Sequence, residues 1–310
     1  MPSSGPIFEV CLHSVGWRQY PREPGPRPGE SVLTELSALA RYGLPMRKVH
    51  VIGIGAGDPD HLTVQAVRAL NEVDVFFLIG KGEVKDDLAA LRTQILATHV
   101  PTRNYRVVEA RDPERDRGAG SGEGAGSAAY RAAVVDWQDR RAEIYARMID
   151  DELPDGGCGA FLVWGDPSLY DGTLRLLERI RATGTDFEVT SIPGISSVQA
   201  LAAAHRLILN RIGRPVLITT GRRIAGGLPP DVDDVVVMLD GGTAFAELPD
   251  ADAADLDIYW GAYLGTPDEL LCSGPLLEVR DEIVTTRASA RARKGWIMDT
   301  YLLRRNAGER

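Results

Sequence analysis

The stretch Ala160-Phe161-Leu162-Val163-Trp164-Gly165-Asp166-Pro167 decides the fold of this chain, because a short apolar run stops there abruptly in a turn. A second stretch of the same kind follows, where the strand-like residues 187–192 run into Pro193-Gly194-Ile195-Ser196-Ser197. Two such turns in one parallel sheet lie side by side at the carboxyl ends of their strands, which is where open α/β sheets bind ligands. The pair predicts a small-molecule site made largely of backbone.

Strands and helices alternate outward from these two turns. The expected buried strands cover residues 48–54, 75–79, 158–163 and 187–192. Apolar residues at helical spacing predict helices over residues 63–70, 87–98, 169–182 and 196–204, and a longer helix that ends near Asp151. Such alternation predicts a mostly parallel five-strand sheet that is covered on both faces.

The pattern changes after Gly213. Short strands are expected over residues 216–219, 235–238, 256–260 and 296–302, with fewer helices between them. They predict a second, smaller α/β domain with a mixed sheet, and an interdomain cleft. We therefore divide the chain into the segments 1–45, 46–212, 213–303 and 304–310. The first segment is rich in proline and glycine, so we expect a flexible extension upstream of a true start at Met46, and the last segment is a tail.

The composition is that of an ordinary soluble globular enzyme. The chain has 310 residues, of which 44% are hydrophobic and 25% charged, and its formal net charge is −9. That acidity argues against nucleic-acid and membrane partners. The cysteines Cys11, Cys158 and Cys272 lie far apart, which favours the reducing cytoplasm and argues against both a disulfide framework and a metal site. No apolar run reaches the roughly 18 residues that a membrane span needs.

A glycine-rich turn, Gly53-Ile54-Gly55-Ala56-Gly57-Asp58-Pro59, follows the first strand. It does not fit a dinucleotide fingerprint, because Asp58 stands where the third glycine should begin the helix that holds pyrophosphate. A carboxylate there repels phosphate. The glycines still indicate a tight turn with a close backbone approach. Asp58 itself is either a cap of the next helix or a functional carboxylate.

The polar residues of the other two turns also have structural and functional interpretations. Asp166 either stabilises its own turn or lies near a ligand, and Ser196 and Ser197 either cap the following helix or contact that ligand. Taken singly, each residue favours the structural interpretation. Their arrangement across three strand ends favours a ligand site.

Basic residues are concentrated in one segment of this acidic chain. No Asp or Glu occurs from Val189 through Pro230, a segment that holds Arg206, Arg211, Arg214, Arg222 and Arg223. The preferred interpretation is an anionic substrate in the interdomain cleft, bound through bidentate guanidinium contacts. The alternatives are a solvated basic face and pairing with distant acids. The glycine-rich segment 118–127 is either a lid or disordered.

Three ordered motifs, GIGAGDPDHLT (53–63), WGDPSLYDGT (164–173) and IPGISSVQALAA (192–203), resemble those of the tetrapyrrole methylases over residues 46–303. The resemblance implies two α/β domains that hold S-adenosyl-L-methionine between them, mostly through main-chain groups. It implies cofactor contacts at the matching positions, which are Ala56, Gly165, Asp166, Leu169, Ser196, Ser197 and, less directly, Met238.

Within that family, the sequence over residues 111–117, 130–137 and 218–223 most resembles that of the deacetylating methylases of aerobic cobalamin biosynthesis. This likeness implies transfer of a methyl group to C-1 of precorrin-5, with loss of the C-20 acetyl group as acetate. It makes Asp58 the first candidate catalytic residue. It makes Arg115, Arg117, Arg222 and Arg223 candidates for contacts with the carboxylates of the precorrin, and it implies a homodimer.

Two other functions remain open on the sequence. The chain could be a methyltransferase of the same fold that acts on a macromolecule, of the diphthine synthase or rRNA 2′-O-ribose methylase type. It could also be a cofactor-binding module without catalytic activity.

Overall fold

The computed structural model describes residues 46–80, 86–114 and 128–306, and the segment 45–310 forms one compact unit. The expected extension over residues 1–45 and the glycine-rich segment 118–127 lie outside the described residues. The same holds for two of the candidate substrate residues, Arg115 and Arg117.

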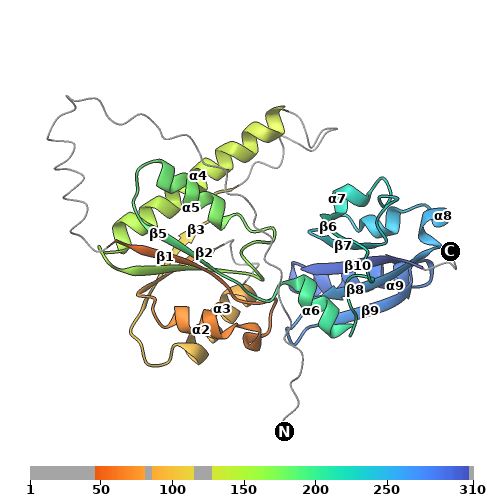
Figure 1. The fold of residues 1–310 in the computed structure, drawn as a ribbon, viewed down its shortest axis with the longest axis horizontal. Coiled ribbons are helices and arrows are strands. Elements are labelled where there is room, and N and C mark those ends of the chain that lie inside the picture. The colour runs from red at the N-terminus through yellow and green to blue at the C-terminus, as the bar shows by residue number, and fades with distance from the viewer. Residues whose placement is uncertain (1–45, 81–85, 115–127, 307–310) are drawn as a thin grey trace, which may run out of the picture. The chain divides into compact units, whose positions relative to one another are not determined.

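The N-terminal sheet is the five-stranded parallel sheet that the alternation predicts (Figure 1). Its strand order is β3-β2-β4-β1-β5, and every pair in it is parallel. The strands are β1 (Lys48–Gly53), β2 (Val75–Gly80), β3 (Arg106–Arg111), β4 (Cys158–Val163) and β5 (Glu188–Ile192). Strand β3 is absent from the expected set, because it lies at the edge of the sheet and mixes charged residues with apolar ones.

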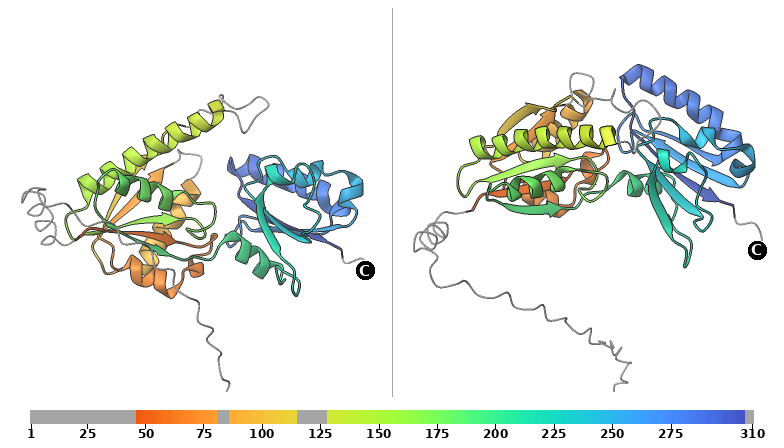
Figure 2. Two further views of the ribbon diagram at one scale, coloured as in Figure 1. Left: turned by 45° about the horizontal axis from the view of Figure 1, so that its top comes forward. Right: turned by 90° about the horizontal axis from the view of Figure 1, so that it is seen from above.

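Helices cover both faces of this sheet (Figure 1 and Figure 2). Helices α4 (Ala128–Glu152) and α5 (Thr173–Ala182) pack on one face, and α2 (Val64–Leu70) and α3 (Asp86–His99) pack on the other. Successive residues of β1 point to opposite faces of the sheet. Val49 and Val51 pack in the core beneath α4 and α5, and Ile52 packs in the core beneath α2 and α3.

Helix α5 begins later than the expected residue 169. Tyr170 has a φ of 56°, which is left-handed, so the chain between Pro167 and Gly172 cannot be helical. The amide of Thr173 donates to Oδ1 of Asp171 at 2.7 Å, in a side-chain turn just before the helix, whose N-cap is Gly172. The residues between the strand and this helix therefore form a longer turn than the sequence predicts.

The C-terminal sheet is mixed, as expected. Its order is β6-β7-β10-β8-β9, in which β6 and β7 are parallel and the other neighbours are antiparallel. The strands are β6 (Val216–Thr220), β7 (Asp234–Met238), β8 (Leu256–Ala262), β9 (Leu270–Pro275) and β10 (Asp299–Arg305). Strand β9 is missing from the expected set, and β10 covers residues 299–305 rather than 296–302, so it runs into the segment expected to be a tail.

A long helix in this part of the chain was also missed. Helix α9 (Leu276–Lys294) turns a narrow buried face toward the sheet and ends where Gly295 adopts a φ of 75°. Its buried face includes a charged residue, Arg287, and arginines and acids fill the rest. The apolar stripe that would reveal the helix is therefore weak.

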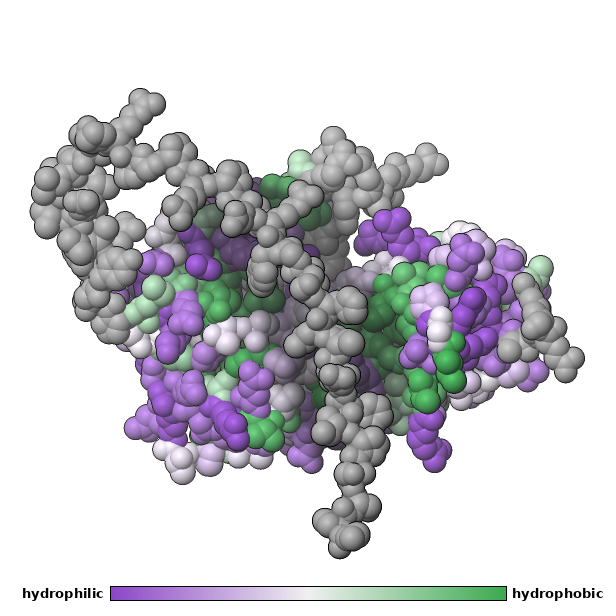
Figure 3. Space-filling view, viewed as in Figure 1, coloured by the Kyte–Doolittle hydropathy of each residue, from purple (hydrophilic) through white to green (hydrophobic). Residues whose placement is uncertain are grey.

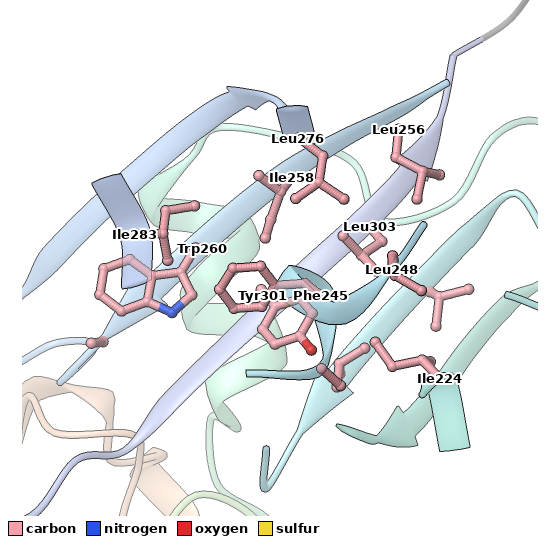
Figure 4. Packing of buried hydrophobic residues seen from close by; sticks show 14 of the residues in the cluster. Ile224, Phe245, Leu248, Leu256, Ile258, Trp260, Leu276, Ile283, Tyr301 and Leu303 are labelled. Carbon is pink, nitrogen blue, oxygen red and sulfur yellow. The ribbon is translucent and has the colours of Figure 1, made fainter. Parts of the chain in front are cut away.

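The core of the C-terminal sheet lies beneath α9 (Figure 4). Leu276 and Ile283 of α9 pack over Ile258 and Trp260, and the rings of Phe245 and Tyr301 meet edge to face with centroids 5.0 Å apart. The short helices α7 (Gly221–Ile224), η4 (Ala244–Glu247) and α8 (Asp250–Ala253) complete this core.

The opposite face of the C-terminal sheet is covered by α6 (Ser197–Ala204). Val198 and Leu201 of this helix share a cluster with Val236 of β7 and Leu302 of β10. The third glycine turn immediately precedes α6, so this packing joins the turn to the C-terminal sheet.

Candidate functional site

The turns that follow β1 and β4 are joined through their main chains, and the turn after β5 packs against both. The amide of Gly165 donates to the carbonyl of Gly55 at 2.8 Å, and the amide of Gly55 donates back to the carbonyl of Gly165 at 3.3 Å. Gly165 reaches this bridge with a φ of 70°, which favours glycine. The structure thus brings together at one sheet edge the turns that the sequence analysis singled out.

Side chains are excluded where these turns meet. A Cβ on Gly194 would lie 2.2 Å from the carbonyl oxygen of Gly165, and a Cβ on Gly53 would lie 2.6 Å from the amide nitrogen of Gly194. Each is well inside van der Waals contact, and each meets backbone rather than a flexible side chain. Only glycine therefore permits this close meeting of backbones, and the edge is built from main chain rather than from side chains.

Asp166 holds two of the turns together. Its Oδ2 accepts a hydrogen bond from the amide of Gly194 at 3.0 Å, and its Oδ1 accepts from the amide of Ser168 at 2.8 Å and from the Ser168 hydroxyl. Burial alone would raise the pKa of Asp166, but these hydrogen bonds to the carboxylate hold it below its usual value. Asp166 is therefore an ionised positioning group with both oxygens engaged.

The two predicted serines have structural partners. The Ser196 hydroxyl caps α6 by accepting from the amide of Val198 at 3.2 Å, within a capping box that includes Gln199. The Ser197 hydroxyl accepts a hydrogen bond from the Thr300 hydroxyl of β10 at 3.0 Å. Ser197 thus joins the third turn to the C-terminal sheet, whereas Ser196 serves its own helix.

Asp58 lies at the start of the short helix η1 (Pro59–His61). Its Oδ1 accepts from the amide of Asp60 at 2.8 Å, so it has the capping role weighed above. The turn before it approaches the C-terminal sheet closely, since a Cβ on Gly57 would lie 2.5 Å from the carbonyl oxygen of Leu264. No described residue bonds to the second carboxylate oxygen of Asp58.

Three of the predicted cofactor residues come together in one apolar cluster. Ala56 of the first turn is buried in it, and Leu169 and Met238 pack against it from the second turn and from the end of β7. These residues are distant in the sequence, so their meeting supports a shared site between the first turn and the C-terminal sheet.

Two residues near this cluster were missed by the sequence analysis. Tyr170 and Leu239 have left-handed φ values of 56° and 53°, and both are exposed, Leu239 to 67%. The Tyr170 hydroxyl reaches the carbonyl of Ile218 on β6 at 3.4 Å. Left-handed backbone at non-glycine residues is often found at functional sites. The signal for Tyr170 was its place within the motif WGDPSLYDGT, whereas nothing local marks Leu239.

Two arginines of the acid-free segment pair with distant acids. Arg211 and Arg214 lie 4.0 Å and 2.9 Å from the carboxylates of Asp234 and Asp233, so for these two the alternative of distant pairing holds instead of the preferred one. Their partners lie beyond Pro230, outside the acid-free segment. Arg222 and Arg223 are exposed on α7 and, within the described residues, form no ion pair.

A buried network supports the loop that follows Met238. Asp240 accepts from the amide of Ala244 at 2.7 Å and from the Tyr301 hydroxyl at 2.6 Å, and its own carbonyl accepts from Arg287 at 2.6 Å. Arg287 in turn forms an ion pair with Asp299 at 2.8 Å. Burial first, and then the adjacent Asp240 carboxylate, raise the pKa of Tyr301, so its hydroxyl stays protonated and donates.

Figure 3 shows hydrophobic residues gathered on the visible face of the part that carries the C-terminal sheet, with hydrophilic residues around them. Ile218 and Leu239 are among the exposed large hydrophobic residues of the chain. A separate groove of 340 Å³ lies between β3 and α4, where Val108, Ile144 and Met148 are among its lining residues. It contains none of the predicted cofactor residues.

No described helix is long and apolar enough to cross a membrane. The described residues also contain no group of three His, Cys, Asp or Glu side chains that could hold a metal ion.

Two packed α/β sheets and a main-chain edge of three glycine turns define a class of methyltransferases. The model of the tetrapyrrole (corrin/porphyrin) methylases matches residues 48–280, and the chain belongs to this family. It is therefore a methyltransferase. Members of the family use S-adenosylmethionine as the methyl donor.

Among individual relatives, a precorrin-6A synthase [deacetylating] from Sinorhizobium sp. is 50% identical over 263 residues, which are 84% of this chain and 97% of that protein. The solved structure of a cobalamin synthesis related protein, CobF, from Corynebacterium diphtheriae is 38% identical, with a TM-score of 0.69. It covers 84% of this chain and 99% of its own.

A uroporphyrin-III-C-methyltransferase from Thermus thermophilus shares the fold at 20% identity, with a TM-score of 0.50 over 83% of this chain and 92% of its own. At this identity the likeness concerns the fold alone.

Proposed function

We propose that this methyltransferase transfers a methyl group from S-adenosylmethionine to C-1 of precorrin-5 and releases the C-20 acetyl group as acetate, giving precorrin-6A. The observation that supports this proposal most directly is the 50% identity to a precorrin-6A synthase [deacetylating], which extends over 97% of that relative. The three joined turns support the same proposal, because they supply the backbone edge that the family uses for its cofactor.

The described residues fit the proposed cofactor. The glycines let the turns approach so closely that main chain rather than side chains forms the edge, and the cluster of Ala56, Leu169 and Met238 adds an apolar wall. When bound, the cofactor supplies a methyl group already activated by a sulfonium. We propose that the main chains of the three turns orient this donor, and that Asp166 keeps two of the turns in register. Gly165, Ser196 and Ser197 would contribute their backbone groups.

Orientation is then the main catalytic task of the protein. An electron-rich ring carbon can attack an activated methyl group without a strong base. Holding donor and acceptor in line can contribute on the order of 7–11 kcal/mol. Release of the acetyl group also needs water and proton transfer. Asp58 is our candidate for that transfer, through the carboxylate oxygen that does not cap η1.

The acceptor in this proposal is an anionic tetrapyrrole. Arg222 and Arg223 are candidates to bind its acetate and propionate groups, because they are exposed and, among described residues, have no acidic partner. Arg115 and Arg117 stay candidates on the sequence alone. Neutralising Arg222 and Arg223 should raise the Michaelis constant for the acceptor more than it lowers turnover. Unchanged acceptor binding in both variants would contradict this role.

We also propose that the enzyme works in the cytoplasm as a homodimer and binds neither nucleic acid nor membrane. Light scattering of the purified chain would test the dimer, and a monomeric mass would refute it.

The decisive experiment incubates the enzyme with precorrin-5 and S-adenosylmethionine labelled at the methyl carbon. We expect labelled methyl and free acetate to appear in equal amounts. Label in added rRNA or protein instead would favour the macromolecular alternative. Failure to bind S-adenosylhomocysteine would indicate a module without activity. Full acetate release by Asp58→Asn would remove Asp58 from the mechanism.

A further inference from the structure

Arg92 of α3 is a cation that the described part of the chain leaves without a partner. The residue is partly buried, its Nε is withdrawn from solvent, and no described group forms a hydrogen bond or an ion pair with it. Burial lowers the pKa of the Arg92 guanidinium, and this effect is opposed in part by Tyr145 and Asp171. A nitrogen withdrawn from solvent without a hydrogen-bond partner costs about 1–3 kcal/mol. An unpaired one therefore needs a reason.

The two groups that act on Arg92 electrostatically are already engaged with other residues. Asp171 uses its Oδ1 to accept from the amide of Thr173 at 2.7 Å. The Tyr145 hydroxyl accepts a hydrogen bond from Nη2 of Arg141 at 3.0 Å. Asp171 thus acts on Arg92 only at longer range, and neither group replaces a directly bound anion.

Arg141 is held rigidly behind Tyr145. Its guanidinium lies 4.7 Å from the centre of the Trp137 ring and forms an ion pair with Asp112 at 2.8 Å. The Tyr145 ring stacks on Phe161 with centroids 4.5 Å apart. Arg141 is therefore neutralised by contact, whereas Arg92 is not.

These residues belong to the ligand-binding edge of the N-terminal sheet. Asp112 directly follows β3, and Asp171 lies in the same turn after β4 as Asp166, which holds the glycine turns. Asp112 and Asp171 therefore lie at the carboxyl edge that carries the three glycine turns. Arg92 belongs to α3, which contacts the short helix η1 of the first turn, and Asp171 acts on Arg92 electrostatically, so Arg92 lies near the same edge.

We propose that Arg92 binds a carboxylate at this edge and supplies a recognition site for the acceptor that the predicted residues do not include. Burial first raises the pKa of Tyr145, so its hydroxyl stays neutral beside Arg141 and does not neutralise Arg92. The inference rests on the proposed function for the source of the carboxylate. In the proposed reaction this carboxylate is either a side chain of the tetrapyrrole or the released acetate.

The first test needs no turnover. Arg92→Met is compared with wild type and with Arg181→Met, an exposed arginine of α5, by thermal unfolding in sodium chloride and in sodium acetate of equal ionic strength. Loss of the unpaired cation should raise the Tm of Arg92→Met by about 2–4 °C. Acetate should raise the Tm of wild type and of Arg181→Met but not that of Arg92→Met. A lower Tm in Arg92→Met, or failure of this variant to fold, would show a structural role and overturn the proposal.

The second test separates the two sources. If Arg92 binds a ring carboxylate, Arg92→Met should raise the Michaelis constant for precorrin-5 about 10- to 100-fold and leave the Kd for S-adenosylhomocysteine unchanged. If Arg92 binds the released acetate, Arg92→Met should leave the Michaelis constant for precorrin-5 unchanged and abolish the inhibition of the enzyme by added acetate. No change in either quantity, or a selective loss of cofactor affinity, would refute the proposal. Absence of precorrin-5 turnover in wild type would instead count against the proposed function, and the Tm comparison would still stand.

Discussion

Gly194→Ala is the smallest change that should separate the three glycine turns. The new methyl group would lie 2.2 Å from the carbonyl oxygen of Gly165, and 2.7 Å and 2.9 Å from the carbonyl carbon and Cα of Gly53. All three neighbours are backbone atoms, so no side chain can rotate away. The turn must move by about 1 Å before these contacts become ordinary ones.

This displacement has two consequences for stability. Overpacking of this kind costs about 1–3 kcal/mol. The movement also strains the hydrogen bond from the Gly194 amide to the Asp166 carboxylate, and a bond to a charged group contributes about 1.5–3 kcal/mol. We therefore expect the free energy of unfolding to fall by about 2–5 kcal/mol. The movement also displaces the main chain that we propose binds the cofactor, so the affinity for S-adenosylhomocysteine should fall.

Urea unfolding and calorimetric titration with S-adenosylhomocysteine measure both effects. The matched control is Gly226→Ala, because Gly226 has no atom within 4 Å of an added Cβ and no left-handed φ. That variant should stay within about 0.5 kcal/mol of wild type and bind the cofactor normally. If folded Gly194→Ala binds S-adenosylhomocysteine as tightly as wild type, the glycine turns do not hold the cofactor.

Three further changes test other parts of the structure. Asp166→Asn replaces one of the two accepting carboxylate oxygens by an NH2 group, so one of the hydrogen bonds to Asp166 is lost. The free energy of unfolding in urea at neutral pH should fall by about 1–3 kcal/mol. An unchanged urea midpoint would contradict the positioning role of Asp166. Arg287→Met leaves Asp299 buried without its ion pair and should lower the free energy of unfolding by about 3–5 kcal/mol, whereas Arg287→Lys keeps a positive charge and should lower it less. Equal losses in the two variants would show that the ion pair is not the source of the stabilisation. Burial lowers the pKa of His50 from 6.5, with partial opposition from Glu72. The unfolded chain therefore binds the proton first, and this contribution to stability is present above pH 6.5 and lost as the pH falls through the lowered folded value. His50→Leu should reduce the fall in urea midpoint between neutral and mildly acidic pH; an identical fall would exclude His50 as its source.

The local sequence was sufficient for four strands of the N-terminal sheet, β1, β2, β4 and β5, and for its three turns. Strands such as 158–163 are continuously apolar because both faces of a parallel sheet are covered, and the turns after them use glycine where backbone meets backbone. Edge strand β3 and helix α9 were missed for the converse reason. Each exposes most of its surface, so polar residues obscure its periodicity.

Charge pairing was beyond the reach of local sequence. The absence of acids between Val189 and Pro230 suggested free arginines, yet Arg211 and Arg214 meet Asp234 and Asp233 once β7 lies beside β6. Arg92 shows the opposite case. It sits in an ordinary helical pattern with acids close by in the sequence, and only the fold withdraws it from water without a described partner.

The sequence by itself indicated the class of protein, because its three motifs at strand ends resemble those of the tetrapyrrole methylases, and a motif is recognised from neighbouring residues alone. Only the tertiary structure shows how the side chains of these motifs are arranged. Ala56, Leu169 and Met238 meet in one cluster, Asp166 joins two turns, and Ser197 bonds to Thr300. The physical reason is range: backbone geometry follows from neighbouring residues, whereas burial, pairing and pKa depend on contacts between residues far apart in the chain.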